Sequence, residues 1–227
     1  IEDSHTNITR IIHGLTCIYE KGSCEELPAD ESDKSALTVD NIYDFIQNVD
    51  TDRLSFLDEC IKMNWAVAQE GLKGRYGLHV GRSIYEDMGE GTAGDDIRNY
   101  AIAVTAAAAD ARMAGCAMSV MTVCGSGNQG ITACMPVLVY AEHLNVSEDK
   151  KYRALALSNL ISLYQKKYLG RLSAYCGAVC AACGSGAAIA YLATGDFDVV
   201  SRTITNTLGN VSGIEVGGQA VLGRQCH

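Results

Sequence analysis

The chain has 227 residues, enough for one large domain or two small ones, and its 48% hydrophobic and 20% charged content is typical of a globular protein. The formal net charge is −9, and no basic stripe interrupts this acidic balance. Nucleic-acid binding and polybasic membrane anchoring both depend on clustered Lys and Arg, so the composition argues against both kinds of partner.

The chain begins at Ile1 without an initiator methionine, a basic leader or an apolar signal segment, so it reads as if it starts inside a longer protein. It carries ten cysteines but no small-domain disulfide framework. Several of them stand in Ala-rich stretches, where a free cysteine acts as a small apolar residue. We therefore expect a reducing compartment, the cytoplasm.

Residues 1–25 are predicted to be the β remnant of an upstream α+β domain. Ile8 to Tyr19 carry β-branched and aromatic residues in loose alternation, broken by Gly14. Residues 26–39 contain Glu, Asp, Ser and Lys together with Pro28, and are predicted to form a linker.

From residue 40 to residue 227 the pattern predicts a mainly α, multi-helix domain. Asp40 is the expected cap of the first helix, and Thr51 or Asp52 that of the second. Small residues from Thr105 to Ala109 permit close helix–helix approach, and Pro136 can kink the helix that contains it. The expected helices cover residues 41–49, 53–72, 96–113, 131–144, 148–169, 171–193 and 199–208.

Two uncharged runs, residues 113–141 and 172–195, are long enough to cross a bilayer. A Gly-rich turn and Pro136 interrupt the first, and the second is mostly Ala, Gly and Cys. A helix buried on all sides in a soluble bundle is the favoured interpretation, so no membrane partner is expected. Insertion of the second run into a membrane is the weaker alternative.

A glycine-rich segment, Gly125-Ser126-Gly127-Asn128-Gln129-Gly130, precedes a predicted helix. Glycine permits a tight turn, and the free N–H groups of the helix's first turn can bind an anion such as a carboxylate, with Asn128 and Gln129 as neutral hydrogen-bonding groups. The segment lacks the Lys-Ser/Thr ending of a Walker loop and the glycine spacing of a dinucleotide fingerprint. A purely structural interhelical turn fits the pattern equally well.

Cys176, Cys180 and Cys183 form C-x3-C-x2-C, the spacing of the radical-SAM cluster motif. That motif lies on a loop, whereas this segment has helical character, so the three sulfurs would be strung along two helical turns. Two interpretations stay open: all three cysteines are small core residues, or one of them is a cluster ligand. Among the histidines, only His5 stands in a polar cluster, and none shows a metal-binding spacing.

Four motifs in their order along the chain resemble the bacterial UPF0597 group. This group includes L-cysteine desulfidases and is related to the α chain of iron–sulfur L-serine dehydratase. The resemblance covers residues 1–214, and the family's proteins are longer, with an N-terminal region that this chain lacks. The motifs are Asp3-Ser4-His5-Thr6-Asn7-Ile8, Gly125-Ser126-Gly127-Asn128-Gln129-Gly130-Ile131, Leu172-Ser173-Ala174-Tyr175-Cys176-Gly177 and Gly209-Asn210-Val211-Ser212-Gly213.

The resemblance implies a serine-dehydratase-like fold and β-elimination of a small amino acid, cysteine or serine. Such an enzyme uses a [4Fe-4S] cluster held by three cysteines, whose open iron acts as a Lewis acid on the substrate. A base takes the α-proton, and the enamine hydrolyses to pyruvate and ammonia. By resemblance, Cys176 is one cluster ligand, Ser126, Asn128 and Gln129 contact substrate or cluster, and His5 is the candidate catalytic residue. Homo-oligomer formation is left open.

The chain departs from this family near its end. The family carries Cys-Asp-Gly-Ala-Lys-Pro-x-Cys after the fourth motif, and here Val216 and Gly223 stand at the two cysteine positions. A frameshift in the encoding gene near Gly218 would explain part of this tail. We therefore expect the intact parent protein to hold a [4Fe-4S] cluster and this fragment to bind none and be inactive. A non-catalytic helical scaffold or small-molecule binding module is the alternative function.

Overall fold

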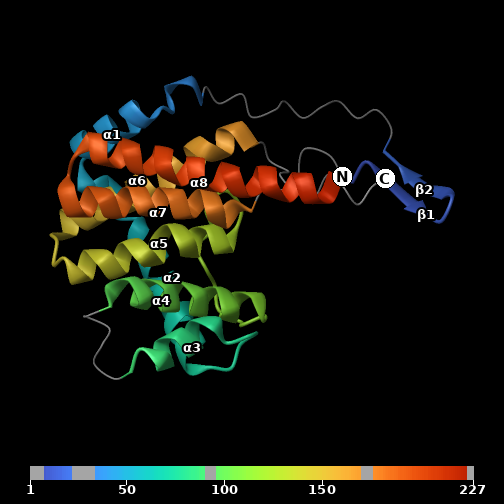
Figure 1. Cartoon of the computed structure of the whole chain (residues 1–227), viewed down its shortest axis with the longest axis horizontal. Coiled ribbons are helices and arrows are strands. Elements are labelled where there is room, and N and C mark those ends of the chain that lie inside the picture. Colours follow the sequence, from blue (N-terminus) through green and yellow to red (C-terminus); the bar gives the residue numbers. More distant parts are fainter. Residues whose placement is uncertain (1–7, 22–33, 90–95, 170–175, 224–227) are drawn as a thin grey trace.

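The computed structural model is mainly helical, as the sequence predicts, with one short N-terminal hairpin (Figure 1). It describes residues 8–21, 34–89, 96–169 and 176–223, and for Leu169 and residues 211–223 it describes the backbone alone. The helices are α1 (Val39–Asn48), α2 (Leu57–Lys73), α3 (Val80–Asp87), α4 (Ile97–Met113), α5 (Gly127–His143), α6 (Glu148–Leu169), α7 (Gly177–Thr194) and α8 (Phe197–Gly223), with 3-10 turns η1 (Lys34–Ala36) and η2 (Thr51–Leu54).

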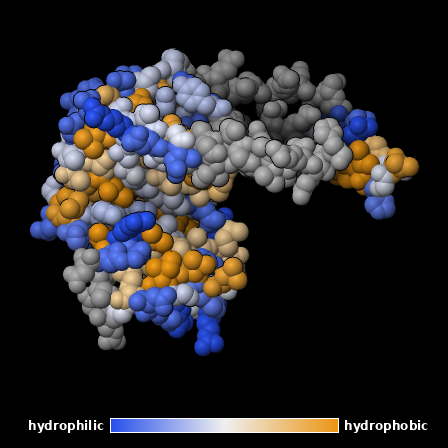
Figure 2. Space-filling view, in the orientation of Figure 1, coloured by the Kyte–Doolittle hydropathy of each residue, from blue (hydrophilic) through white to orange (hydrophobic). Residues whose placement is uncertain are grey.

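The hairpin joins β1 (Arg10–His13) to β2 (Thr16–Glu20) in antiparallel register. Gly14 turns the chain with a φ of 62°, a left-handed conformation that glycine adopts without steric cost. Every residue of both strands is exposed, and Figure 2 shows apolar side chains on the hairpin surface. Most of the predicted linker lies outside the described residues, and the predicted domain boundaries stay predictions.

Two of the predicted helix caps are wrong. The Oγ1 of Thr38 accepts the Asn41 N–H at 3.2 Å, so Thr38 caps α1 and Asp40 lies inside its first turn. Asp50 caps the 3-10 turn η2 by accepting the Asp52 N–H, and α2 begins after that turn with no side-chain cap. Asp96, expected as the first residue of its helix, is the N-cap of α4 and accepts the Asn99 N–H.

The helices stack in layers, with α5 near the middle of the bundle (Figure 1). On one side α5 packs against α4 and α2, and on the other against α6 and α7, while α3 covers α4 and α8 covers α7. Ile131, Met135, Val137 and most other side chains of α5 are buried. The interpretation of the first uncharged run as a buried central helix is therefore confirmed for α5.

Helix α7 is the one described helix whose length and composition would allow it to cross a membrane. Half of this segment is buried inside the protein, where α5, α6 and α8 pack on it. A methyl group added at Gly184 would lie 2.3 Å from the Ser158 carbonyl oxygen of α6, so the small residues of α7 serve close helix packing. The same property that makes α7 apolar therefore fits it to the bundle interior.

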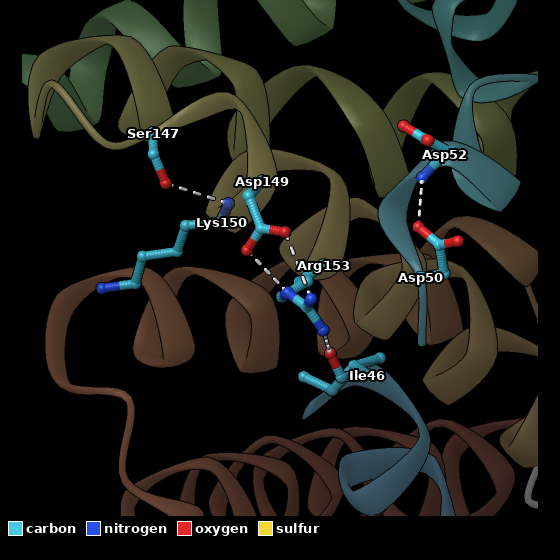
Figure 3. Close-up of polar contacts among 7 residues, drawn as sticks. All are labelled: Ile46, Asp50, Asp52, Ser147, Asp149, Lys150 and Arg153. Atoms are coloured by element: carbon cyan, nitrogen blue, oxygen red, sulfur yellow. Dashed lines mark hydrogen bonds and ion pairs between the residues drawn. The ribbon is translucent and has the colours of Figure 1, made fainter. Parts of the chain in front are cut away.

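A polar cluster fixes α6 against α1 (Figure 3). The guanidinium of Arg153 donates to both carboxylate oxygens of Asp149, at 2.7 and 3.1 Å, and also to the Ile46 carbonyl of α1. The hydrogen bond from Arg153 lowers the pKa of Asp149. Ser147 accepts the Lys150 N–H at 3.3 Å at the start of α6. The Arg153–Asp149 pair lies within α6, the bond to Ile46 joins α6 to α1, and Ser147 caps α6, so we interpret this cluster as structural.

Candidate functional site

The glycine-rich segment forms a tight turn that leads directly into α5. Val123 and Ser126 exchange backbone hydrogen bonds of 3.1 and 3.0 Å, and between them Cys124 and Gly125 have φ values of 52° and 78°. Two successive left-handed residues between paired residues define a two-residue hairpin turn. Glycine tolerates this conformation, whereas Cys124 carries strain. The helix begins at Gly127, four residues earlier than predicted, so the motif supplies the helix N-terminus itself.

Ser126 and Asn128, two of the predicted substrate-binding residues, both have partners in the protein. Ser126 is the N-cap of α5, and its Oγ accepts the Gln129 N–H at 3.5 Å. The Oδ1 of Asn128 accepts a hydrogen bond of 3.1 Å from Nη1 of Arg112, which stands in the last turn of α4. Ser126 therefore caps the helix that follows the turn, and Asn128 connects the start of α5 to the guanidinium of Arg112.

Gln129, the third predicted substrate-binding residue, is buried with 1% of its surface exposed. Its side-chain nitrogen, Nε2, finds no hydrogen-bond partner among the described residues. A methyl group added at Gly177 would lie 2.5 Å from Cδ of Gln129 and 2.8 Å from Nε2. The absence of a side chain at Gly177 therefore makes room for Gln129 at the start of α7.

Cys176, the predicted cluster ligand, stands directly before Gly177 as the N-cap of α7. It is exposed, and its side chain makes no capping hydrogen bond. The structure thus brings the end of one predicted motif, Cys176-Gly177, against Gln129 of another. The N-termini of α5 and α7 meet at this contact, and each carries the partial positive charge of a helix start.

Cys180 and Cys183 lie farther along α7 and are buried with 1% exposure each. Burial raises the pKa of both thiols, that of Cys183 to about 11, so neither is predisposed to ionise. These two cysteines act as small core residues.

A three-cysteine cluster site is not formed by the residues that the structure describes. Within those ranges, no group of three His, Cys, Asp or Glu side chains could hold a metal ion. Cys176 can supply one thiolate, but the described residues do not fit a [4Fe-4S] cluster by themselves. His5 and residues 172–175 of the cysteine motif lie outside the described residues.

Sequence reasoning missed Arg112 and Asn64 at this site. Arg112 Nε would lie 2.3 Å from a methyl group added at Gly127, so the guanidinium packs on the first residue of α5. The buried amide of Asn64 accepts the Met121 N–H at 3.0 Å and donates to the Gly130 carbonyl at 3.3 Å. Neither residue belongs to a local motif, because each reaches the turn from a different helix.

An apolar cleft of about 490 Å³ borders the same turn. Phe45, Leu57, Leu160 and Leu163 contribute to its walls, and Met121 to Cys124 line the side next to the turn. Such a lining suits apolar groups, whereas the hydrogen-bond donors lie at the starts of α5 and α7. We therefore place the candidate site at the two helix N-termini.

Comparisons with known proteins agree with the motifs. The family described as "Serine dehydratase alpha chain" matches residues 8–218. A UPF0597 protein of Fusobacterium nucleatum is 44% identical over 94% of this chain and 51% of its own length. Corresponding proteins of Desulfitobacterium hafniense and Clostridium perfringens are 43% and 44% identical over 96% and 94% of this chain and half of their own lengths. No solved structure matches. The chain spans about half the length of these curated relatives, and it belongs to the serine dehydratase alpha chain family.

Proposed function

We propose that the full-length protein of this family catalyses β-elimination of L-cysteine or L-serine, and that the part given by this chain supplies the surface that binds the amino acid. The contact between Gln129 and Gly177, with Cys176 alongside, carries the proposal. It brings two separate family motifs to one place, where two helix N-termini meet and the Gln129 amide has no partner among the described residues.

The reaction has three chemical requirements. A base removes the α-proton, the Cβ–S or Cβ–O bond breaks to release sulfide or water, and the resulting enamine tautomerises to an imine. Addition of water to the imine then releases ammonia and pyruvate. The substrate must also be bound and oriented for these steps. The described residues can do this, because they offer neutral and cationic hydrogen-bond donors to a carboxylate. His5 is our candidate for the base.

For the cofactor, we propose that a [4Fe-4S] cluster belongs to the longer protein. Its chemistry there would be Lewis-acid activation of the leaving group. This chain would contribute the Cys176 thiolate and hold no cluster alone. By itself the chain should then be inactive. We propose a small amino acid as the substrate that this protein binds, and the cytoplasm as its compartment.

A second candidate function is a non-catalytic scaffold or small-molecule binding module. The buried Nε2 of Gln129, which has no partner in the described part of the chain, favours binding over a purely structural role, because such a donor is costly unless a partner completes it. A binding module would use the same helix N-termini without the thiolate of Cys176.

The test is to purify this chain without oxygen, beside a version extended to the full length of its relatives. Iron, acid-labile sulfide and visible absorption are measured for both, and pyruvate is assayed with L-cysteine and L-serine. We expect a cluster and pyruvate formation in the extended protein only. Replacing Cys176 by Ser should abolish both, whereas Cys17→Ser, a change at another exposed cysteine, should leave them intact. An extended protein that forms neither a cluster nor pyruvate would overturn β-elimination and leave the binding module.

A further inference from the structure

We propose that Arg112, the N-terminus of α5 and the side-chain amide of Gln129 form a binding site for a carboxylate, and that Arg112 selects the α-carboxylate of the amino acid. This inference rests on the proposed function for the identity of the ligand. Its physical basis, a cation and hydrogen-bond donors around one helix start, stands on the structure alone.

The cation comes from α4. Arg112 donates to Oδ1 of Asn128 at 3.1 Å and to the Met113 sulfur at 3.3 Å, and its Nε packs on Gly127. No carboxylate pairs with Arg112 in the part of the chain that the structure describes. A guanidinium has five N–H donors, so most of them stay available for a planar, two-oxygen ligand.

The second observation is the orphan donor. Gln129 is 1% exposed and its Nε2 has no partner among the described residues, yet it lies against the first residue of α7. A buried donor without an acceptor is unfavourable, and a ligand oxygen would complete it. Arg112, the Nε2 of Gln129 and the starts of α5 and α7 are donors or positive poles, so the complementary ligand is an anion.

A carboxylate fits these groups because Arg112 and Gln129 border the same helix start. Arg112 approaches it over Gly127 and Asn128, whereas Gln129 lies toward α7. One carboxylate at the start of α5 would therefore accept from Arg112, from the helix N–H groups and from Nε2 of Gln129. A neutral amide in place of the carboxylate would lose the charge-assisted part of this binding.

The experiment uses the chain as it is, with pyruvate, L-serine and L-serinamide as probes, followed by amide chemical shifts and titration calorimetry. Pyruvate and L-serine carry a carboxylate, and L-serinamide does not. We expect the first two to bind and to shift the amides of Gly127, Asn128 and Gly177. L-serinamide should bind at least about tenfold more weakly.

Two variants distinguish the binding role from a structural one. Arg112→Gln should weaken binding roughly tenfold to hundredfold, whereas Arg98→Gln, on an exposed residue at the opposite end of α4, should leave it unchanged. Gln129→Leu removes an unpaired donor at similar size, so it should weaken binding while the denaturation midpoint stays the same or rises. A lower midpoint for Gln129→Leu with undiminished binding would overturn the site.

The outcomes also separate this inference from the proposed function. If the wild-type chain binds none of the carboxylates, or binds L-serinamide as well as L-serine, the carboxylate site is wrong even where the extended protein makes pyruvate. If the carboxylates bind and Arg112→Gln abolishes binding, while the extended protein forms no pyruvate, the site stands and β-elimination fails.

Discussion

Replacing Gly71 by Ala should destabilise the protein, although alanine is the better helix former. Gly71 lies near the end of α2, and a methyl group there would stand 2.0 Å from the Ala107 carbonyl oxygen of α4 and 2.5 Å from its carbonyl carbon. These are backbone atoms inside a helix, so no side-chain rotation can relieve the contact. Gly81 of α3 meets the same residue, at 2.0 Å from the Ala107 nitrogen.

The loss of stability in Gly71→Ala can be estimated from the distance between the added methyl group and the Ala107 carbonyl oxygen. An ordinary contact begins at 3.4 Å, so α2 and α4 would have to separate by about 1.4 Å, the difference between 3.4 and 2.0 Å, to admit the methyl group. Overpacking of this kind costs roughly 3 kcal/mol, and the higher helix propensity of alanine returns about 1 kcal/mol. We expect a net loss of about 2 kcal/mol, which for a chain of this size is a melting temperature lower by roughly 4–8 °C.

Gly186→Ala is the matched control. Gly186 also lies inside a helix, α7, but a methyl group there would meet only the Thr203 Cγ2, at an ordinary 3.7 Å. This variant should gain about 0.5–1 kcal/mol from helix propensity. Both variants are measured by circular dichroism at 222 nm during thermal and urea denaturation. A Gly71→Ala variant as stable as the parent, beside a stabilised Gly186→Ala, would refute the close approach of α2 and α4.

Two further predictions concern polar side chains that join different parts of the fold. Asn64→Leu should lower the free energy of unfolding, measured by urea denaturation, by about 1–3 kcal/mol and speed hydrogen exchange at the Met121 amide. The substitution leaves the Met121 N–H unpaired and removes the hydrogen bond to the Gly130 carbonyl. Unchanged exchange at Met121 would contradict this role of Asn64. Tyr152 donates a hydrogen bond to Asp58, which raises the pKa of the phenol to about 12. The hydrogen bond favours the neutral phenol over the phenolate. The stability that this bond contributes should therefore be complete below the ordinary tyrosine pKa of about 10 and be lost as the pH rises through about 12. Absorbance at 295 nm should show a late-titrating tyrosine that moves toward pH 10 in Asp58→Ala, and the absence of such a shift would refute the assignment.

The sequence predicts the bounds of some helices well and those of others poorly. The bounds of α6, Glu148–Leu169, match the expected range, because its pattern repeats often enough to fix both ends. Helix α8 runs on to Gly223, past its expected end at residue 208, because the low helix propensity of Gly209 and Asn210 predicts an end there. Helix α3, Val80–Asp87, was missed. It is short, starts after His79 in a left-handed conformation, and has no side-chain cap, so little in its local sequence marks it as helical. Its place depends on the close approach of Gly81 to α4, which is a tertiary effect.

The candidate site divides in the same way. The glycine-rich turn before a helix is a local property, and the sequence predicts both the turn and its potential for anion binding. The contact of Gln129 with Gly177 joins two helices that are distant along the chain, and nothing in either segment alone specifies the other. Arg112 is invisible for the same reason, because its role depends on where the end of α4 lies relative to the start of α5.

The arrangement around Gln129 is easier to explain as a binding site than as packing. A leucine would fill a similar volume without an unpaired donor, whose burial costs about 1–3 kcal/mol. Gly177 adds to that cost, since an alanine would favour the first turn of α7 but would collide with the Gln129 amide. Tight backbone contacts, such as that of Gly130 with the Met121 carbonyl, hold the turn in place despite both costs. A framework that keeps an amide donor rigid between two helix N-termini, with no acceptor among the described residues, is preorganised for a ligand that carries its own acceptors.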